Sequence, residues 1–155
     1  MIIGGFNNEK NTYYFNSQNE KWVQGPQLEQ ERRYHSCGRI MRDKQTLETS
    51  IIVVGGKDQS KNYLSSVEIL DERSNVWRQG PELPFEIYGS QMIEDRNGGV
   101  VLIGGKAKSG DYLNTLFHLP LAGQDARWRK MEQKLKSAQY RHTAFLIPDD
   151  IVECS

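Results

Sequence analysis

The chain has 155 residues, a formal net charge of zero and 37 % hydrophobic residues. A neutral chain has no overall field that attracts nucleic acid or an anionic membrane, so neither partner is expected. No N-terminal signal pattern and no apolar stretch long enough to span a membrane occurs in the sequence, which favours a cytoplasmic protein.

The first predicted elements are short strands. Two isoleucines lead into the double glycine Gly4-Gly5, an aromatic segment follows at 13–15, and a turn that begins at Asn16 leads to Trp22. Runs of β-branched and aromatic residues bounded by turn residues predict strands. Asn at the start of such a turn binds its own backbone, which predicts a hairpin between the aromatic segment and the tryptophan.

The same order of elements recurs in the middle of the chain. The run I-I-V-V-G-G at 51–56 is followed by V-E-I-L-D at 67–71, with Asp71 six residues before Trp77, as Asn16 is before Trp22. A Gly-Pro pair follows each tryptophan, at 25–26 and at 80–81. The unbroken apolar run before the double glycine predicts a strand that is covered on both faces.

A third copy begins at V-V-L-I-G-G, residues 100–105, and reaches Trp128. Gly56 follows Gly5 by 51 residues, and Gly105 follows Gly56 by 49. After each tryptophan a tyrosine opens a predicted strand, at Tyr34, Tyr88 and Tyr140. The last of these strands is expected at 140–147, and the start of another at 151–155. No helix of any length is expected.

Residues that recur in every copy indicate structural roles, because chemistry needs a residue only once. Glycine permits a positive φ and close approach of the backbone at a strand end. Tryptophan can fill the wedge between neighbouring sheets, with its indole N–H on a polar partner. The predicted structural positions are Gly4, Gly5, Trp22, Tyr34, Gly55, Gly56, Trp77, Tyr88, Gly104, Gly105, Trp128 and Tyr140.

The period of roughly 50 residues, the double glycines, the tryptophans and the Gly-Pro turns resemble kelch repeats over nearly the whole chain. The resemblance implies an all-β fold, a partial kelch-type β-propeller of about three four-stranded blades. It divides the chain into 1–28 (strands two to four of a blade), 34–83 (a complete blade), 88–135 (a complete blade) and 140–155 (the first strand and the start of the second strand of a further blade). The third copy departs from the pattern, since it lacks the acidic turn residue and the Gly-Pro.

The resemblance also implies where partners bind. In such proteins the residue after each double glycine and the arginine before the innermost strand line the partner pocket. The matching positions here are Phe6, Lys57, Lys106 and Arg33. Two lysines and an arginine favour an acidic segment of a partner protein, because they offer charge-assisted hydrogen bonds.

The sequence therefore predicts a non-catalytic protein-interaction module that resembles the kelch domain of ubiquitin-ligase substrate adaptors, without their BTB part. No metal, cofactor or catalytic residue is expected, since His35, His118 and His142 do not converge on this layout. Two alternatives stay open: an actin-binding kelch scaffold, and a fragment of a kelch-like sugar-modifying or oxidase enzyme.

Three blades leave two sheet faces unpaired, whereas propellers close with about four to eight blades. One interpretation is that the chain is a fragment of a longer kelch protein. A second is a homodimer that closes a six-bladed ring, and a third is an open array of repeats.

Overall fold

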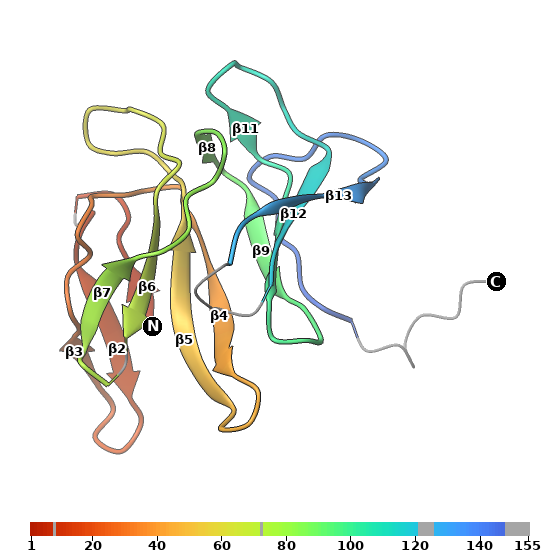
Figure 1. The fold of residues 1–155 in the computed structure, drawn as a ribbon. Helices are drawn as coiled ribbons and strands as arrows, with labels where there is room; N and C mark the ends of the chain where they lie inside the picture. The colour runs from red at the N-terminus through yellow and green to blue at the C-terminus, as the bar shows by residue number, and fades with distance from the viewer. Residues whose placement is uncertain (8, 72, 121–125, 148–155) are drawn as a thin grey trace.

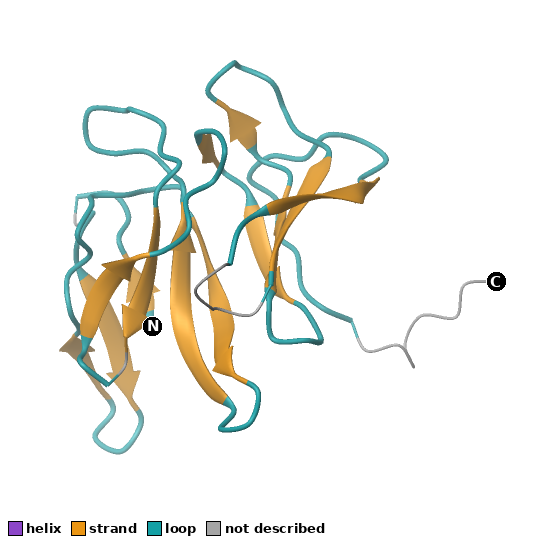
Figure 2. Cartoon of the chain, in the orientation of Figure 1, coloured by secondary structure: helices purple, strands orange, loops and turns teal. Residues whose placement is uncertain are grey.

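The computed structural model describes residues 1–7, 9–71, 73–120 and 126–147. Over these ranges the chain forms strands and turns and no helix, so the all-β prediction is confirmed (Figure 2). Three antiparallel sheets follow one another along the chain (Figure 1). The first sheet has the order β1 (Ile2–Ile3), β2 (Thr12–Asn16) and β3 (Lys21–Gln24).

The second and third sheets have four strands each. The second has the order β4 (Ser36–Asp43), β5 (Glu48–Val54), β6 (Val67–Asp71) and β7 (Val76–Gln79). The third has the order β9 (Gln91–Glu94), β10 (Val100–Ile103), β12 (Thr115–Leu119) and β13 (Arg129–Lys134). A two-stranded ribbon of β8 (Ile87–Tyr88) and β11 (Lys106–Ala107) lies beside the third sheet.

The central strand β5 is buried on both faces, which explains its unbroken apolar sequence. Val53 packs on the side of the first sheet, against Leu28 and Trp77. Ile52 and Val54 point to the opposite side and pack in the core shared with the third sheet. Successive side chains of a strand alternate between faces, so a strand between two sheets needs apolar residues at every position.

These contacts define two junctions. The first junction, between the first and second sheets, has a small buried apolar cluster, with Ile3 and Ile51 packed on it: Leu28, Val53, Leu70 and Trp77. The second junction, between the second and third sheets, has a larger one: Ile40, Ile52, Val54, Val67, Leu83, Ile87, Met92, Val100, Leu102, Phe117, Leu119 and Trp128.

The three double glycines share one backbone conformation. The first glycine of each pair has φ between 57° and 62°, and the second has φ between 99° and 108°. A Cβ on Gly55 would lie 2.6 Å from the carbonyl oxygen of Ile87. Any side chain here would therefore strain the backbone and also clash with the neighbouring crossing segment.

The predicted hairpin turns are also present. The carboxylate of Asp71 accepts the backbone N–H groups of Arg73 and Ser74, and the side chain of Asn16 accepts that of Gln18. These bonds satisfy backbone donors that have no partner in the ladder, which is why Asn and Asp begin such turns.

Two of the three tryptophans join neighbouring sheets as predicted. Trp77 is 1 % exposed and donates its indole N–H to the carbonyl of Pro26, at 2.9 Å. Trp128 is 8 % exposed and donates to the carbonyl of Pro81, at 2.8 Å. Each indole thus binds the Gly-Pro turn that follows the previous sheet.

The prediction is wrong for Trp22, which is 55 % exposed and contacts Phe15. In the described part of the chain, no sheet lies on the side of β3 that corresponds to the covered side of β7. An indole fills a wedge only where a second sheet forms the other wall.

A second correction concerns 140–147, where a strand was expected. The structure forms no strand at these residues, and Phe145 is 73 % exposed. A strand is defined and stabilised by its ladder of hydrogen bonds, and no strand among the described residues pairs with this segment. The strand expected at 151–155 lies outside the described residues.

The connections emerge at the two ends of the sheets. Loops 57–64 and 106–113 and the ribbon of β8 and β11 lie at one end, and the hairpins β2–β3, β4–β5 and β9–β10 lie at the other (Figure 1). The end that carries the loops holds the four residues predicted to contact a partner.

Candidate functional site

Lys57 lies between two tyrosine rings. Its backbone pairs with both Arg33 and Tyr63, which fixes the lysine after the double glycine. The ammonium lies 4.5 Å from the ring centroid of Tyr63 and 3.8 Å from that of Tyr88. Both distances fall within the range of cation–π attraction, so the rings hold the charge at the surface.

The next repeat builds the same arrangement. Lys106 also follows a double glycine, and its backbone pairs with Tyr112. Its ammonium lies 4.6 Å from the centroid of the Tyr112 ring. In both copies the tyrosine comes six residues after the lysine, so each loop carries the ring that holds its own cation.

Arg33 and Phe6 form a third cation–aromatic pair. The guanidinium lies 4.6 Å from the centroid of the Phe6 ring, and Phe6 is 65 % exposed. Nη1 of Arg33 also contacts Oε1 of Glu9 at 3.2 Å. A ligand carboxylate at Arg33 would therefore meet a guanidinium whose position is already set by a ring and a carboxylate.

Tyrosine rings connect these pairs across the sheets. Tyr88 contacts Tyr34 at a centroid distance of 6.2 Å and Tyr140 at 5.3 Å, and Tyr140 contacts Tyr112 at 5.5 Å. Arg141 lies 4.4 Å from the ring of Tyr34 and 5.0 Å from that of Tyr140. Burial, together with the hydroxyl of Tyr88, raises the pKa of Tyr140 above its ordinary value.

We call this connected set of cations and rings the cation–aromatic face, with Tyr88, which is 7 % exposed, at its centre. It contains six aromatic residues and four cations, which come from loops and crossings of all three sheets: Phe6, Arg33, Tyr34, Lys57, Tyr63, Tyr88, Lys106, Tyr112, Tyr140 and Arg141. Of these four cations, Arg33 forms an ion pair with a carboxylate, that of Glu9.

All four residues predicted to bind a partner, Phe6, Arg33, Lys57 and Lys106, lie on this face, and their binding role stays a prediction. Tyr63, Tyr112 and Arg141 were not predicted from the sequence. The recurrence of tyrosine six residues after Lys57 and Lys106 was a usable signal for the first two.

The alignment of Tyr34 with Tyr88 and Tyr140 is off by one residue. Gly5, Gly56 and Gly105 donate their backbone N–H groups to the carbonyls of Arg32, Ile87 and Gln139, which makes these three residues equivalent. Arg33 therefore corresponds to Tyr88 and Tyr140. Tyr34 corresponds to Gly89 and Arg141, and all three have positive φ: 56°, 66° and 51°. Counting from the tryptophans agrees with this for the first two repeats, since Arg33 and Tyr88 each lie 11 residues after their tryptophan, whereas Tyr140 lies 12 residues after Trp128.

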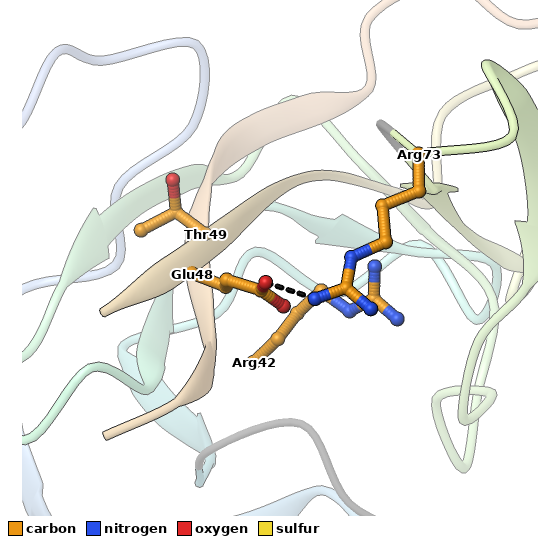
Figure 3. A pocket seen from close by; sticks show the side chains of 4 residues that line it. All are labelled: Arg42, Glu48, Thr49 and Arg73. Atoms are coloured by element: carbon orange, nitrogen blue, oxygen red, sulfur yellow. Dashed lines mark hydrogen bonds and ion pairs between the residues drawn. The ribbon is translucent and has the colours of Figure 1, made fainter. Parts of the chain in front are cut away.

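A pocket at the opposite end of the second sheet is lined by Arg42, Glu48, Thr49 and Arg73 and has a volume of about 220 Å³ (Figure 3). Its charges compensate each other, since Glu48 pairs with Arg73, and Arg42 lies 3.4 Å from Asp71. Over residues 1–7, 9–71, 73–120 and 126–147, no three His, Cys, Asp or Glu side chains converge on one point. The cation–aromatic face is therefore the better candidate.

Comparison with known proteins agrees with this architecture. The kelch motif model matches residues 45–84. Kelch-like protein 40a of Danio rerio is 31 % identical over 120 residues, which are 70 % of this chain and 18 % of that protein. Kelch-like protein 41 of Mus musculus is 29 % identical over 126 residues, 75 % of this chain and 20 % of that protein.

The chain thus spans about a fifth of the length of the curated relatives that it matches. Among solved structures, that of YjhT superposes with a TM-score of 0.67 over 84 % of this chain and 45 % of that chain. At 15 % identity this likeness shows a common fold alone. Within the described residues there is no helix that could cross a membrane. The repeats, the matched motif and the shared architecture together identify the chain as a kelch-repeat protein that folds as blades of a β-propeller.

Proposed function

We propose that the chain is a protein-interaction module that binds an acidic segment of a partner protein through the cation–aromatic face. The observation that carries this proposal is the set of four cations that rest on aromatic rings at one end of the blades. A cation held over a ring keeps its charge and its remaining N–H donors available to a ligand.

The face suits recognition because its cations are already positioned. A lysine or arginine that is free in solution loses rotamer entropy when it binds a ligand, at a cost of roughly 0.5–1.5 kcal/mol per side chain. Lys57 and Lys106 have part of that freedom removed by Tyr63, Tyr88 and Tyr112. The side chain of Arg33 is 11 % exposed and its Nη1 already binds Glu9, so a ligand carboxylate would add to that pair, whereas the lysines act as point charges.

A role as substrate adaptor of a ubiquitin ligase is part of the proposal. It is supported by the similarity to kelch-like proteins and by a face that offers cations and aromatic rings to a ligand. In that role the face would bind the substrate, and assembly with a ligase would depend on other protein segments.

We also propose that two copies can close a six-bladed ring. Support comes from the exposed side of the first sheet, where Ile2, Phe15 and Trp22 are 50, 49 and 55 % exposed. Their counterparts Val53, Leu70 and Trp77 are 0, 6 and 1 % exposed because the first sheet covers them. A species of twice the 17.8 kDa chain mass in sedimentation, lost on Trp22→Asp, is the expected result; a monomer at all concentrations would exclude the ring.

Partner binding is tested by charge reversal on the face. Proximity labelling in cells with Arg33→Glu/Lys57→Glu is expected to lose the proteins that the wild-type chain labels. Arg39→Glu/Arg73→Glu is the matched control, because it reverses two exposed arginines away from the face. Equal labelling by wild type and face variant, or equal loss with the control, would refute the proposed binding face.

A further inference from the structure

A shallow apolar groove opens at the second junction and is separate from the surface residues of the cation–aromatic face. Its volume is about 370 Å³, and two phenylalanine rings, Phe85 and Phe117, meet in it with centroids 5.0 Å apart. The groove is lined by Pro84, Phe85, Ala107, Ser109, Leu113, Thr115, Phe117 and Lys130.

The same place at the first junction is a smaller, polar pocket of about 180 Å³, whose lining includes Gln30, Glu68 and Gln79. Arg32 corresponds to Ile87, so Gln30 stands where Phe85 stands, and Glu68 stands where Phe117 stands. The amide of Gln30 binds the hydroxyl of Ser66, and Glu68 binds Arg32. Since the same backbone accommodates either set of side chains, packing of the fold does not require the apolar lining at the second junction.

Cations lie along the edge of this groove. Residues 127–136 contain five Lys and Arg against one carboxylate, Glu132. All five cations are exposed, and within the described residues no ion pair is seen for them. Lys130 lies opposite Phe117 in the ladder of β12 and β13, and Lys134 lies opposite Thr115, so both project on the groove side.

Within the described residues, the backbone edge beside the groove is also unpaired. β13 is the outermost strand of the third sheet and pairs with β12 on one edge alone. The other edge offers alternating N–H and C=O groups, which can pair with an added strand. Apolar lining, flanking cations and a free strand edge thus occur together at one place.

We propose that this groove and the free edge of β13 form a second docking site, for an extended acidic segment of a partner protein. The segment adds as a strand on β13, places an apolar side chain in the groove, and directs carboxylates to Lys130 and Lys134. A peptide fits better than a nucleic acid, because the free edge of β13 can pair with a peptide backbone and Phe117, which is 8 % exposed, offers little ring surface on which a base could stack.

The site can be tested by NMR on the intact chain with a defined probe, the peptide Asp-Glu-Asp-Leu-Phe-Asp-Glu-Asp. Amide shifts are expected in β13 and at 113–117, which carry no residue of the cation–aromatic face, and they should weaken when Gly-Gly replaces Leu-Phe in the probe. Lys130→Glu/Lys134→Glu should lower affinity about tenfold or more through lost charge-assisted bonds. Ser109→Trp, which fills the groove without changing charge, should also abolish the shifts.

The matched control is Gln79→Glu, because Gln79 lies opposite Glu68 as Lys130 lies opposite Phe117. This variant should bind like the wild type. Absence of shifts at millimolar probe, equal binding of the Gly-Gly probe, or shifts confined to the cation–aromatic face would overturn the proposal. Stronger shifts of the same amides with oligouridylate would overturn it in favour of nucleic acid. Failure here leaves the binding function of the cation–aromatic face intact, since that face is probed by different residues.

Discussion

The two junctions between blades use the same backbone and opposite chemistry. At the first, the side chain of Arg32 is fully buried, and its Nη2 lies 2.6 Å from Oε1 of Glu68. At the second, the equivalent residues are Ile87 and Phe117, which belong to the apolar core. The side chain at a repeat position that bridges two blades must therefore match the side chain it contacts in charge and polarity. It need not be one particular residue type.

The backbone amides explain why the pairs are not freely exchangeable one residue at a time. Glu68 also accepts the backbone N–H groups of Glu29 and Gln30, at 2.6 and 3.2 Å. The position equivalent to Glu29 at the second junction is Pro84, which has no N–H to satisfy. The second junction thus lacks both the backbone N–H that Glu29 donates at the first junction and the carboxylate of Glu68 that accepts it. Few polar groups are therefore left unpaired at either junction.

The largest expected effect comes from the tryptophans that join blades. Trp77→Ala and Trp128→Ala should each lower the free energy of unfolding by about 3–5 kcal/mol, because a large buried ring is removed. Trp22→Ala should change it by less than about 1 kcal/mol, since that indole is exposed. Urea unfolding at concentrations where the chain is monomeric measures all three. Equal losses of unfolding free energy in all three variants would mean that the indole of Trp22 is buried as well.

Removing one partner of the buried pair should cost nearly as much. Glu68→Ala leaves the guanidinium of Arg32 buried without a counter-charge, which is expected to destabilise by about 3–5 kcal/mol. The triple variant Glu29→Pro/Arg32→Ile/Glu68→Phe carries the residues of the second junction at these three positions and should recover more than half of that loss. If the triple variant is no more stable than Glu68→Ala, the apolar residues of the second junction cannot replace the buried ion pair of the first.

A pH dependence should distinguish the first junction from the second. Burial, and then the charge of Arg32, lower the pKa of His35 to about 4, and Ser90 occupies the equivalent place at the second junction. Between pH 6.5 and 4 the unfolded chain binds a proton that the native His35 does not, so stability falls as the pH is lowered through this window. The contribution is on the order of 2–3 kcal/mol.

His35→Gln should reduce this slope, as measured by thermal or urea unfolding from pH 7 to pH 4. Burial also lowers the pKa of His142, so part of the dependence should persist in the variant. An unchanged slope in His35→Gln would assign the whole effect to other groups.

The smallest effect is expected at the exposed ion pair that crosses the second junction. Arg39 on β4 lies 3.1 Å from Glu94 on β9, and both side chains are largely open to solvent. Glu94→Gln should leave the melting temperature unchanged within error, because water and salt screen such pairs. A loss comparable to that of Glu68→Ala would show that exposure does not separate the two ion pairs.

Much of the architecture could be read from local patterns. The double glycines need positive φ wherever they occur, and the turn residues Asn16 and Asp71 bond to their own backbone, so both signals act within a few residues. The cation–aromatic face could be predicted in part, because Lys57 and Lys106 follow double glycines and the resemblance to kelch repeats assigned those positions to partner binding. Arg33 was placed on it by resemblance.

What could not be predicted depends on which residues meet across a junction. Arg32 and Glu68 are 36 residues apart, and nothing in either segment marks them as a buried pair. The exposure of Trp22 has the same origin, since its own segment matches that of Trp77.

The sequence by itself determined the repeat, the turns and the strands of the three sheets, because each depends on the conformational preferences of a few consecutive residues, but it wrongly predicted a strand at 140–147. Only the tertiary structure decided which tryptophans are buried, which cations rest on rings and which junction is ionic. Burial and complementarity are properties of two surfaces in contact, and a single repeat supplies only one of the two surfaces.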